Sequence, residues 1–365
     1  MSAADTRFLS LALALGRRGL GRTWPNPSVG CVIVRDGRIV GRGVTAPGGR
    51  PHAEPQALAQ AGKAARGATA YVSLEPCAHH GQTPPCADAL VAAGITRVVA
   101  PLTDGDPRVN GAGFARLRGA GVEVVTGLCT DQAAEDHAGF FLRVGQGRPM
   151  VTLKLAQTLD GRIATATGES QWITGPEARA QVHLMRATHD AVLVGGGTAR
   201  ADDPSLNVRG LGAMPQPVRL VASRKLDLPT DSVLARTARD IPVWLLHGPD
   251  APGDRREAWR VLGAELVDCG LKGRHIDMGE ALRALGDRGL TRVFCEGGGD
   301  LAASLLSAGL VDRLVVFSAG MALGAEGRPA LGALGVEALA DAPRFNLREQ
   351  RRVGADVMQV WTAPA

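Results

Sequence analysis

The sequence predicts two α/β domains, and three observations support this. The chain has 365 residues, of which 45% are hydrophobic, well beyond the roughly 100–200 residues of a typical domain. Short β-branched segments alternate with helical patterns in both halves, which indicates sheets covered by helices. A Gly/Pro-rich stretch at 145–149 interrupts the pattern. We therefore expect domains at residues 1–146 and 147–365, with one large α/β domain as the alternative.

The first domain is predicted to alternate between helices and strands. The pattern gives a helix over 6–19 and a β-hairpin over 30–44 that turns at Asp36–Gly37. No basic segment precedes the apolar run in that helix, so we interpret it as structure rather than as a secretory signal. The remaining elements are a helix over 54–65, a strand over 68–74, a helix over 85–93, a strand over 97–100, a helix over 113–120, a strand over 122–125 and a helix over 131–144.

Buried strands dominate the second domain, and glycine turns or helices follow several of them. This arrangement is typical of an α/β sheet. A helix over about 300–308 follows the last predicted strand. The predicted strands cover 150–156, 191–195, 218–223, 243–246 and 292–297.

Composition excludes several function classes. No apolar stretch reaches the roughly 20 residues that span a bilayer, so we expect no membrane partner. The formal charge is +5, but acidic and basic residues are interleaved, and one Tyr and five Trp offer few stacking platforms for nucleic acid. A phosphorylated small molecule accounts for this charge equally well. Six cysteines are too few for a disulfide scaffold, which favours a cytoplasmic location.

A catalytic zinc site is predicted in the first domain. His52, Cys77 and Cys86 supply three ligands and leave a fourth tetrahedral position for water. Zinc lowers the pKa of such a water to about 7, and Glu54 is placed to move its proton. Zinc base deaminases carry H-x-E and P-C-x-x-C; here the second cysteine follows nine residues on. The alternative is a closed structural site with His79 or His80 as fourth ligand.

Asn26 is a further candidate in the first domain. Pro25 and Pro27 flank it, and a side-chain amide held between prolines can meet the edge of a heterocycle with little loss of entropy. The alternative is an ordinary Asx turn.

The second domain carries signals for phosphate binding. Gly195–Gly197 and Gly297–Gly299 each follow an apolar strand, and helix N-termini at such turns bind phosphate, although tight turns also need glycine for steric reasons. The segment 223–225, Ser-Arg-Lys, ends a strand, where it either meets the 2′-phosphate of NADPH or is solvated. Lys154 interrupts an apolar strand and needs a partner, either a substrate phosphate or hydroxyl, or Asp160.

Motifs along nearly the whole chain resemble one family, the bifunctional riboflavin-biosynthesis deaminase-reductases. In the first domain, PNPxVGCVI is matched at 25–33, HAE at 52–54 and SLEPC-x-H-x-G-[KR]-TPPC at 73–86. In the second domain the matches are KLAxSLDGR at 154–162, GESxWIT at 168–174, LVGxGTxxxDDPxLxxR at 193–209 and EGG at 296–298.

The resemblance implies a cytidine-deaminase-like three-layer domain followed by a dihydrofolate-reductase-like α/β domain. It implies zinc-dependent hydrolytic deamination of 2,5-diamino-6-ribosylamino-4(3H)-pyrimidinone 5′-phosphate, then NADPH reduction of the ribosyl group to ribityl. We also expect a homo-oligomer. Implied substrate contacts are Ser170, Arg186, Leu206, Arg209 and Glu296, and implied NADPH contacts are Ala156, Trp172, Thr198, Asp202, Ser223, Gly298, Gly299, Asp300, Leu301, Ala302, Ala303 and Ser304.

In the first domain the sequence departs from the family pattern at two places. Gln82 stands where the family has Lys or Arg, and Gly105-Asp106-Pro107 replaces Pro-Asn-Pro. Both departures concern substrate contacts of the deaminase site rather than its metal ligands. Two other hypotheses compete with the bifunctional enzyme: a deaminase acting on a base in RNA with a non-catalytic C-terminal domain, and a C-terminal nucleotide-sensing module that regulates the first domain without turnover.

Overall fold

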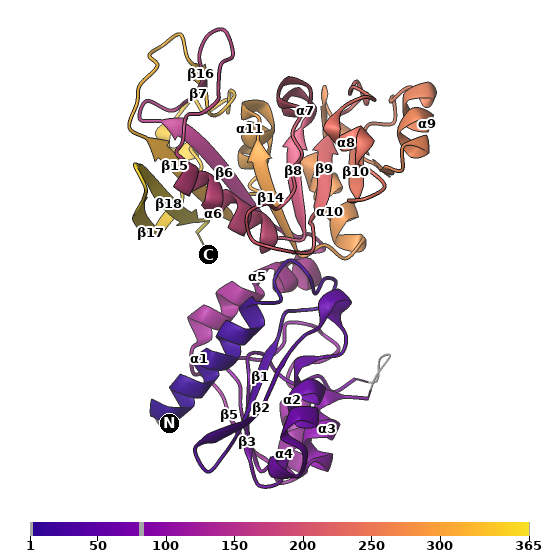
Figure 1. Cartoon of the computed structure of the whole chain (residues 1–365), viewed down its shortest axis with the longest axis vertical. Coiled ribbons are helices and arrows are strands. Elements are labelled where there is room, and N and C mark those ends of the chain that lie inside the picture. Colours follow the sequence, from indigo (N-terminus) through magenta and orange to yellow (C-terminus); the bar gives the residue numbers. More distant parts are fainter. Residues whose placement is uncertain (1–2, 80–83, 365) are drawn as a thin grey trace. The chain divides into compact units, whose positions relative to one another are not determined.

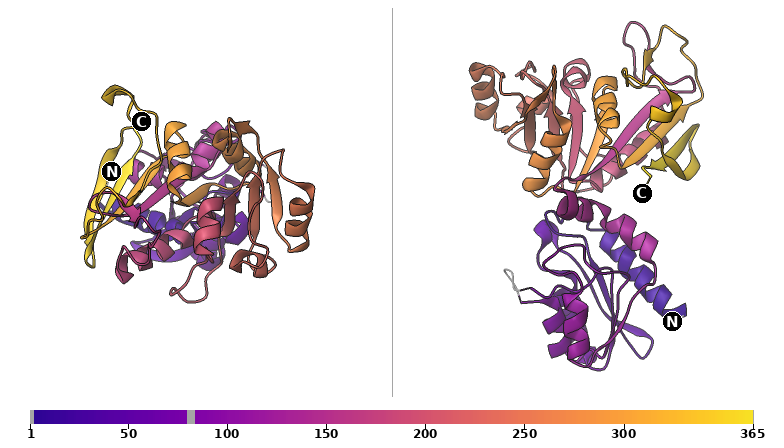
Figure 2. Two further views of the ribbon diagram at one scale, coloured as in Figure 1. Left: turned by 90° about the horizontal axis from the view of Figure 1, so that it is seen from above. Right: turned by 180° about the vertical axis from the view of Figure 1, so that it is seen from behind.

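The computed structural model describes residues 3–79 and 84–364. They form two compact units, Met1–Gly147 and Arg148–Ala365 (Figure 1, Figure 2). The division between the units lies inside the Gly/Pro-rich stretch at 145–149. No helix of the described residues is both long and apolar enough to cross a bilayer.

A mixed sheet forms the centre of the first unit, with strand order β2-β1-β3-β4-β5. The predicted hairpin forms its antiparallel edge, while β3, β4 and β5 run parallel to one another. The strands are β1 (Gly30–Arg35), β2 (Arg38–Val44), β3 (Thr69–Val72), β4 (Arg97–Val99) and β5 (Glu123–Val125).

Helices cover both faces of this sheet, which gives three layers (Figure 1). Strand β1 shows why: Cys31 and Ile33 pack with α2, α3 and α4, whereas Val32 and Val34 pack with α1 and α5. Successive side chains of a strand point to opposite faces, so a strand buried on both faces is apolar throughout. The helices are α1 (Ala3–Arg17), α2 (Ala53–Ala61), α3 (Cys86–Ala92), α4 (Ala112–Gly119) and α5 (Thr130–Gln146).

A glycine on β2 allows α2 to lie very close to the hairpin. A Cβ atom added at Gly43 would stand 2.0 Å from the carbonyl oxygen of Ala53, which no larger residue could tolerate. Ala53 lies between His52 and Glu54. The sequence of the hairpin therefore fixes where the first turn of α2 presents these two side chains.

The second unit is built on a long sheet with strand order β11-β10-β9-β8-β14-β6-β15-β18-β17. The first seven strands in this order, β11 through β6 to β15, are parallel to one another. Strands β18 and β17 continue the sheet in antiparallel pairing. The strands are β6 (Met150–Thr158), β8 (Ala191–Gly195), β9 (Val218–Ala222), β10 (Val243–His247), β11 (Glu265–Asp268), β14 (Arg292–Gly297), β15 (Arg313–Ala319), β17 (Asn346–Val353) and β18 (Asp356–Thr362).

Helices and short hairpins complete this unit. The sheet is packed by apolar clusters, one around Trp259 and Phe294 and another around Phe317 and Met358. The helices are α6 (Pro176–Ala187), α7 (Gly196–Asp202), α8 (Val233–Arg236), α9 (Gly253–Val261), α10 (Met278–Asp287) and α11 (Gly299–Ser307), and the short strand pairs are β12 (Leu271–Lys272) with β13 (His275–Ile276) and β7 (Arg162–Ala164) with β16 (Arg328–Pro329).

The carboxyl ends of the parallel strands of this unit lie on the same side of the sheet. Most of the predicted site residues of the unit lie on this side. Lys154 and Ala156 lie on β6, Glu296 and Gly297 end β14, and Gly195 ends β8. Open α/β sheets bind ligands at the carboxyl ends of their strands. The α/β fold class predicted from the sequence is thus confirmed in both units.

Candidate active sites

The first unit brings the three predicted metal ligands together. One ligand atom each from His52, Cys77 and Cys86 lies within 4.8 Å of the others, and this cluster has three members among the described residues. His52 Nδ1 is 3.3 Å from Cys86 Sγ and 3.7 Å from Cys77 Sγ. Tetrahedral zinc at ordinary Zn–N and Zn–S lengths separates nitrogen from sulfur by about 3.6 Å. The donor set and its spacing therefore fit Zn²⁺.

Two helix starts and one loop position these ligands. His52 is the N-cap of α2, and Cys86 is the first residue of α3. Cys77 lies in the loop after β3, where its sulfur accepts the Cys86 backbone N–H at 3.3 Å and its carbonyl accepts the Ala87 N–H. Helix N-termini favour negative charge, so these positions suit thiolates.

Electrostatics at the cluster favour a thiolate and a proton-carrying carboxyl. The hydrogen bond from Cys86, followed by that from His52, lowers the pKa of the Cys77 thiol to about 4. Glu54 is 3% exposed, and burial followed by the nearby Cys77 raises the pKa of its carboxyl. A carboxyl with a raised pKa can both accept and release a proton near neutral pH.

Glu75, two residues before Cys77, has a structural role that its motif does not reveal. Its buried carboxylate accepts backbone N–H groups of Asp104, Gly111 and Phe114 at 2.9–3.0 Å. These contacts tie the 104–114 segment to the metal loop. The only sign of this role in the sequence is that Glu75 is the acidic residue of the SLEPC motif.

Asn26 reaches the loop that leads to His52. Its Nδ2 donates to the Gly49 carbonyl at 3.0 Å, and its own backbone N–H donates to Thr23. This side-chain hydrogen bond therefore joins Asn26 to a different segment of the chain. In the alternative, an Asx turn, the side chain of Asn26 would bond within its own turn. The amide oxygen and the second N–H remain available to a ligand.

The alternative of a closed structural site requires His79 or His80 as the fourth zinc ligand. His79 does not belong to the metal cluster, and its buried Nδ1 has no hydrogen-bond partner within 3–79 and 84–364. His80 and Gln82 lie outside the described residues. The structure therefore gives no support to a fourth ligand at His79.

In the segment that departs from the family pattern, Asp106 is buried, as is Asp104 just before it. Asp104 accepts the Asp106 N–H at 2.8 Å, and Asp106 binds the guanidinium of Arg108. Burial raises the pKa of Asp104 to about 7, and the neighbouring Asp106 and Glu75 act in the same direction. The Arg108 guanidinium lowers the pKa of Asp106. Asp106 is thus a paired anion here.

The second unit contains a large cavity at the carboxyl ends of its parallel strands. Its volume is about 1130 Å³, enough for a dinucleotide and a second small ligand. Of the predicted substrate contacts in this unit, the cavity is lined by Lys154, Ser170, Arg186, Leu206, Arg209 and Glu296; of the predicted cofactor contacts, it is lined by Ala156, Trp172, Thr198, Asp202, Gly298, Gly299, Asp300, Leu301 and Ser304.

Three predicted cofactor contacts do not line this cavity. Ala302 and Ala303 are buried within α11, below its first turn. Ser223 is also buried, and its hydroxyl donates to Asp227 Oδ1 at 3.0 Å. Of these three, Ser223 lies next to Ala222 and Arg224, which do line the cavity.

Charged groups gather at the end of the cavity formed by β6 and β14. Arg186 of α6 holds Glu296 in a two-point ion pair and donates to the Asn207 carbonyl at 2.8 Å. Burial raises the pKa of Glu296, but Arg186 outweighs it and the net pKa is lowered. Burial lowers the pKa of Lys154, whereas the nearby carboxylates of Glu296 and Asp202 act to raise it.

The alternative in which Lys154 pairs with Asp160 is wrong. Asp160 instead accepts from the hydroxyl of Thr158 and from the backbone N–H groups of Leu323 and Gly324. Lys154 has no hydrogen bond or ion pair within the described chain, so its ammonium faces the cavity.

Several cavity residues were not predicted from the sequence. Arg179 stacks on the ring of Trp172 at 4.6 Å and donates to the Thr174 carbonyl, which supports the 168–174 loop. His183 accepts the Arg209 N–H. Arg274 and Arg328 also line the cavity. Neither arginine lies in a motif, so only the folded arrangement identifies them.

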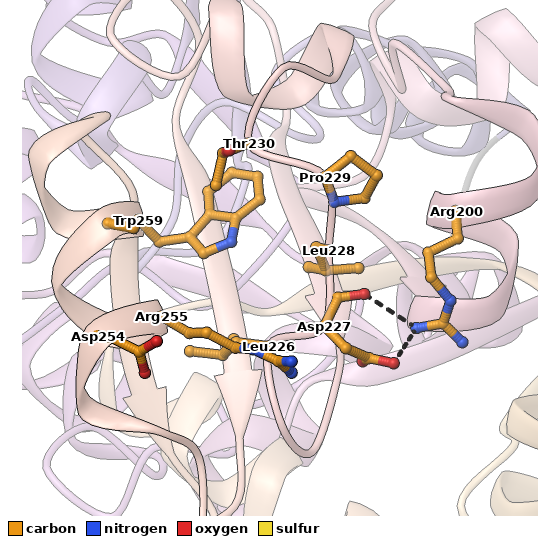
Figure 3. A pocket seen from close by; sticks show the side chains of 10 residues that line it. Arg200, Leu226, Asp227, Leu228, Pro229, Thr230, Asp254, Arg255 and Trp259 are labelled. Atoms are coloured by element: carbon orange, nitrogen blue, oxygen red, sulfur yellow. Dashed lines mark hydrogen bonds and ion pairs between the residues drawn. The ribbon is translucent and has the colours of Figure 1, made fainter.

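A smaller cavity of about 440 Å³ lies beside α9, between Trp259 and the 226–230 loop (Figure 3). Arg200 forms an ion pair with Asp227 at 2.9 Å on its wall, and both side chains are visible in Figure 3. Because Asp227 also accepts from Ser223, this ion pair fixes the turn that follows β9.

Comparison with known families supports two activities. A model of the cytidine and deoxycytidylate deaminase zinc-binding region matches residues 2–102. A model of the RibD C-terminal domain matches residues 149–359. These matches cover the metal cluster and the large cavity, respectively.

Curated proteins and solved structures agree with the family models. The riboflavin biosynthesis protein RibD of Escherichia coli is 45% identical over 97% of this chain and 98% of its own length, and that of Haemophilus influenzae is 42% identical over 99% and 98%. A RibD structure from Acinetobacter baumannii superposes with a TM-score of 0.87 at 38% identity and 99% coverage of both chains. A Thermotoga maritima structure described as a diaminohydroxyphosphoribosylaminopyrimidine deaminase/5-amino-6-(5-phosphoribosylamino)uracil reductase gives 0.86 at 32% identity, also with 99% of both chains covered.

Proposed function

This chain belongs to the RibD family of bifunctional riboflavin-biosynthesis deaminase-reductases, and from this premise we propose how its residues divide the two reactions. The metal cluster of the first unit deaminates 2,5-diamino-6-ribosylamino-4(3H)-pyrimidinone 5′-phosphate. The cavity of the second unit reduces the ribosyl group of the product with NADPH. The observation that carries this proposal is that a three-ligand zinc-type cluster and a dinucleotide-sized cavity occur in one chain.

In the deaminase, His52, Cys77 and Cys86 hold the zinc. When bound, the metal supplies the Lewis acid that activates a water near neutral pH. Glu54 accepts a proton from the attacking water and delivers it to the departing exocyclic amino nitrogen on C2, and the second water proton ends on a ring nitrogen. The C2–N bond breaks, ammonia leaves and a C2 carbonyl remains. The raised pKa of Glu54 supports this two-way role.

Asn26 orients the pyrimidine. The bond from its side chain to the Gly49 carbonyl holds the carboxamide beside the loop before His52, and its amide oxygen would accept from the substrate. Fixed hydrogen-bonding groups of this kind position a substrate at little entropic cost.

In the reductase, the residues that would hold NADPH lie at the carboxyl ends of β14, β8 and β9. The first turn of α11, Gly299–Asp300, offers backbone N–H groups to the diphosphate, and the helix dipole favours that anion. Ala156 and Trp172, which line the cavity, would hold the nicotinamide end, and Thr198 and Asp202, which also line it, would hold the middle. Ser223 supports the far end from its buried position.

The substrate occupies the other end of the cavity, near β6. Ser170, Leu206 and Arg209 contact the sugar phosphate and the base. The Arg186–Glu296 pair presents a fixed carboxylate to the ribosyl group, and the ammonium of Lys154 binds a ribosyl oxygen. Alignment of C1′ with the nicotinamide and exclusion of water are what hydride transfer requires of the protein.

Self-association is part of the proposal. Strand β17 has a neighbour, β18, on one side, and its outer edge offers unpaired backbone groups. Leu347 on this strand is 48% exposed and Leu339 before it is 85% exposed. An edge with large exposed apolar side chains favours a homo-oligomer through this part of the second unit. Light scattering of the whole chain, with Leu339→Ser and Leu347→Ser together, tests the interface.

The test of both activities is one coupled assay. Zinc-loaded protein is given the diamino-pyrimidinone ribosyl phosphate, and ammonia release and NADPH absorbance are followed together. Ammonia release followed by NADPH oxidation supports the proposal. Ammonia without NADPH oxidation, even when deaminated substrate is supplied, favours the nucleotide-sensing alternative. Ammonia release from an RNA base but not from the small molecule favours the RNA deaminase.

A further inference from the structure

We infer that Arg274, in the β12–β13 hairpin, recognises the ribose 2′-phosphate of the dinucleotide and thereby gives the second unit its preference for NADPH over NADH. This inference rests on the proposed NADPH site. It concerns a residue that lies outside every motif of the chain, and four observations support it.

The order of the strands indicates where the adenosine half of the dinucleotide lies. Lys154, assigned to the substrate, and Ala156, assigned to the nicotinamide, are on β6, and the glycine turn before α11 ends β14. Beyond β14 follow β8 and then β9. A dinucleotide whose diphosphate sits at α11 and whose nicotinamide points toward β6 must extend its adenosine toward β9 and β10. Arg224 and Arg274 line the cavity at that end.

Ser223, the polar residue at the end of β9, is already engaged. Its hydroxyl proton is donated to Asp227 Oδ1 at 3.0 Å, and its side chain is 4% exposed. Asp227 is held in turn by Arg200 (Figure 3). A phosphate needs donors, so Ser223 in this arrangement does not supply one.

Arg224 is also engaged. Its Nε and Nη2 pair with the carboxylate of Asp250, Nη2 at 2.8 Å, and its Nη1 donates to the backbone carbonyl of Arg274 at 3.0 Å. The carboxylate of Asp250 is therefore its counter-ion. The function of Arg224 here is to fix the hairpin that carries Arg274.

Arg274 remains as a free cation on a fixed hairpin. Its guanidinium makes no hydrogen bond or ion pair within the described residues, and it lines the cavity. The hairpin is anchored at its base, where Glu280 accepts the Gly270 N–H at 3.0 Å and the Gly270 carbonyl accepts the Asp277 N–H. A guanidinium binds phosphate through two parallel hydrogen bonds, so a fixed Arg274 suits a monoester phosphate.

The same hairpin provides a matched control. Lys272 pairs across the hairpin with His275, carries the same charge as Arg274 and is exposed, but it does not line the cavity. Replacing either residue by glutamine removes one positive charge from the same surface loop. A long-range electrostatic effect would act on both variants, whereas direct recognition would act on Arg274→Gln only.

The experiment is calorimetric binding of 2′,5′-ADP and 5′-AMP, which differ by the 2′-phosphate, to the full-length protein. We expect wild type to prefer 2′,5′-ADP and Arg274→Gln to lose roughly 10- to 100-fold of that preference, with Lys272→Gln close to wild type. Equal losses for both variants, or for both nucleotides, would overturn the inference. If wild type binds neither nucleotide and does not oxidise NADPH, the proposed cofactor site itself fails; if it oxidises NADPH and NADH equally, only the role of Arg274 fails.

Discussion

The guanidinium of Arg186 and the carboxylate of Glu296 face each other in a partly buried two-point ion pair, with Nη2 2.9 Å from Oε2, although 110 residues separate them in the chain. Arg186 comes from α6 and Glu296 from the end of β14. The Arg186 guanidinium also donates to the Asn207 carbonyl, and this third contact holds the loop that carries Leu206 and Arg209. One ion pair therefore organises three parts of the reductase cavity.

Glu296→Gln should abolish most reductase activity while the deaminase remains. Removing one partner of a buried pair leaves an uncompensated charge, which costs about 3–5 kcal/mol, and displacement of the loop lowers kcat/KM by at least roughly 100-fold. NADPH oxidation with deaminated substrate, ammonia release and urea unfolding measure the three effects. An unchanged NADPH oxidation rate would remove Glu296 from the site.

Glu54→Gln should stop deamination without releasing zinc. Loss of the proton carrier lowers kcat by roughly 10²- to 10⁴-fold, whereas the three ligands are intact. Metal content by atomic emission, measured beside ammonia release, separates Glu54 from a ligand. The control is Cys86→Ser, which should lose zinc as well as activity. Zinc loss in Glu54→Gln would make it a ligand and contradict the assigned role.

Removal of zinc should inactivate only one of the two reactions. Dialysis against a strong chelator should abolish ammonia release, and Zn²⁺ should restore it. NADPH oxidation with deaminated substrate should continue, because the metal cluster and the reductase cavity belong to different units. A reductase that stops with chelation would show that the metal also supports the second reaction.

The reductase should lose activity at alkaline pH as Lys154 loses its proton. Burial lowers the pKa of Lys154 below its ordinary value of 10.5, so the charged form is complete well below that pKa and disappears as pH rises through it. Lys154→Arg keeps its charge to higher pH and should move the alkaline limb of kcat/KM upward, whereas Lys154→Met should lose activity at every pH. An alkaline limb that is the same in wild type and Lys154→Arg would exclude Lys154 as its cause.

The one tyrosine of the chain should titrate late. Burial, followed by the hydrogen bond from Tyr71 to Asp5 at 3.0 Å, raises the pKa of the phenol to about 12. A folded-state pKa above the unfolded value of about 10 stabilises the fold below pH 10, and this contribution disappears as pH rises toward 12. Absorbance at 295 nm should show the midpoint, and Asp5→Asn should bring it closer to 10. A wild-type midpoint near 10 would contradict this contact.

Local motifs made the metal site predictable. His52 and Glu54 are two residues apart, and Cys77 and Cys86 lie on one loop and the helix that follows it. Ligands this close in sequence are recognisable by spacing. The strands of the first unit were predictable for a related reason, as were β6, β8, β9, β10 and β14 of the second, because each is a short apolar run between turns. Strands β11, β15, β17 and β18 were not predicted.

The remaining features depend on which strands become neighbours. Arg186 meets Glu296 because β14 lies between β8 and β6, an order that no local pattern records. Strand β17 was not predicted because its first seven residues are exposed and mostly polar, without the alternation that marks a half-buried strand. Arg274 gains its significance only from the place of its hairpin beside the cavity.

The bonds of Glu75 to three backbone N–H groups bear on how mutational screens of this protein are to be understood. A library scored by growth without riboflavin would rank Glu75 and Glu54 alike, because loss of either stops the first reaction. Their causes differ: Glu75 variants should accumulate as misassembled protein, whereas Glu54 variants should accumulate in full as folded, inert enzyme. Counting soluble protein alongside growth would sort the acidic residues of the motif into those that build the enzyme and those that operate it.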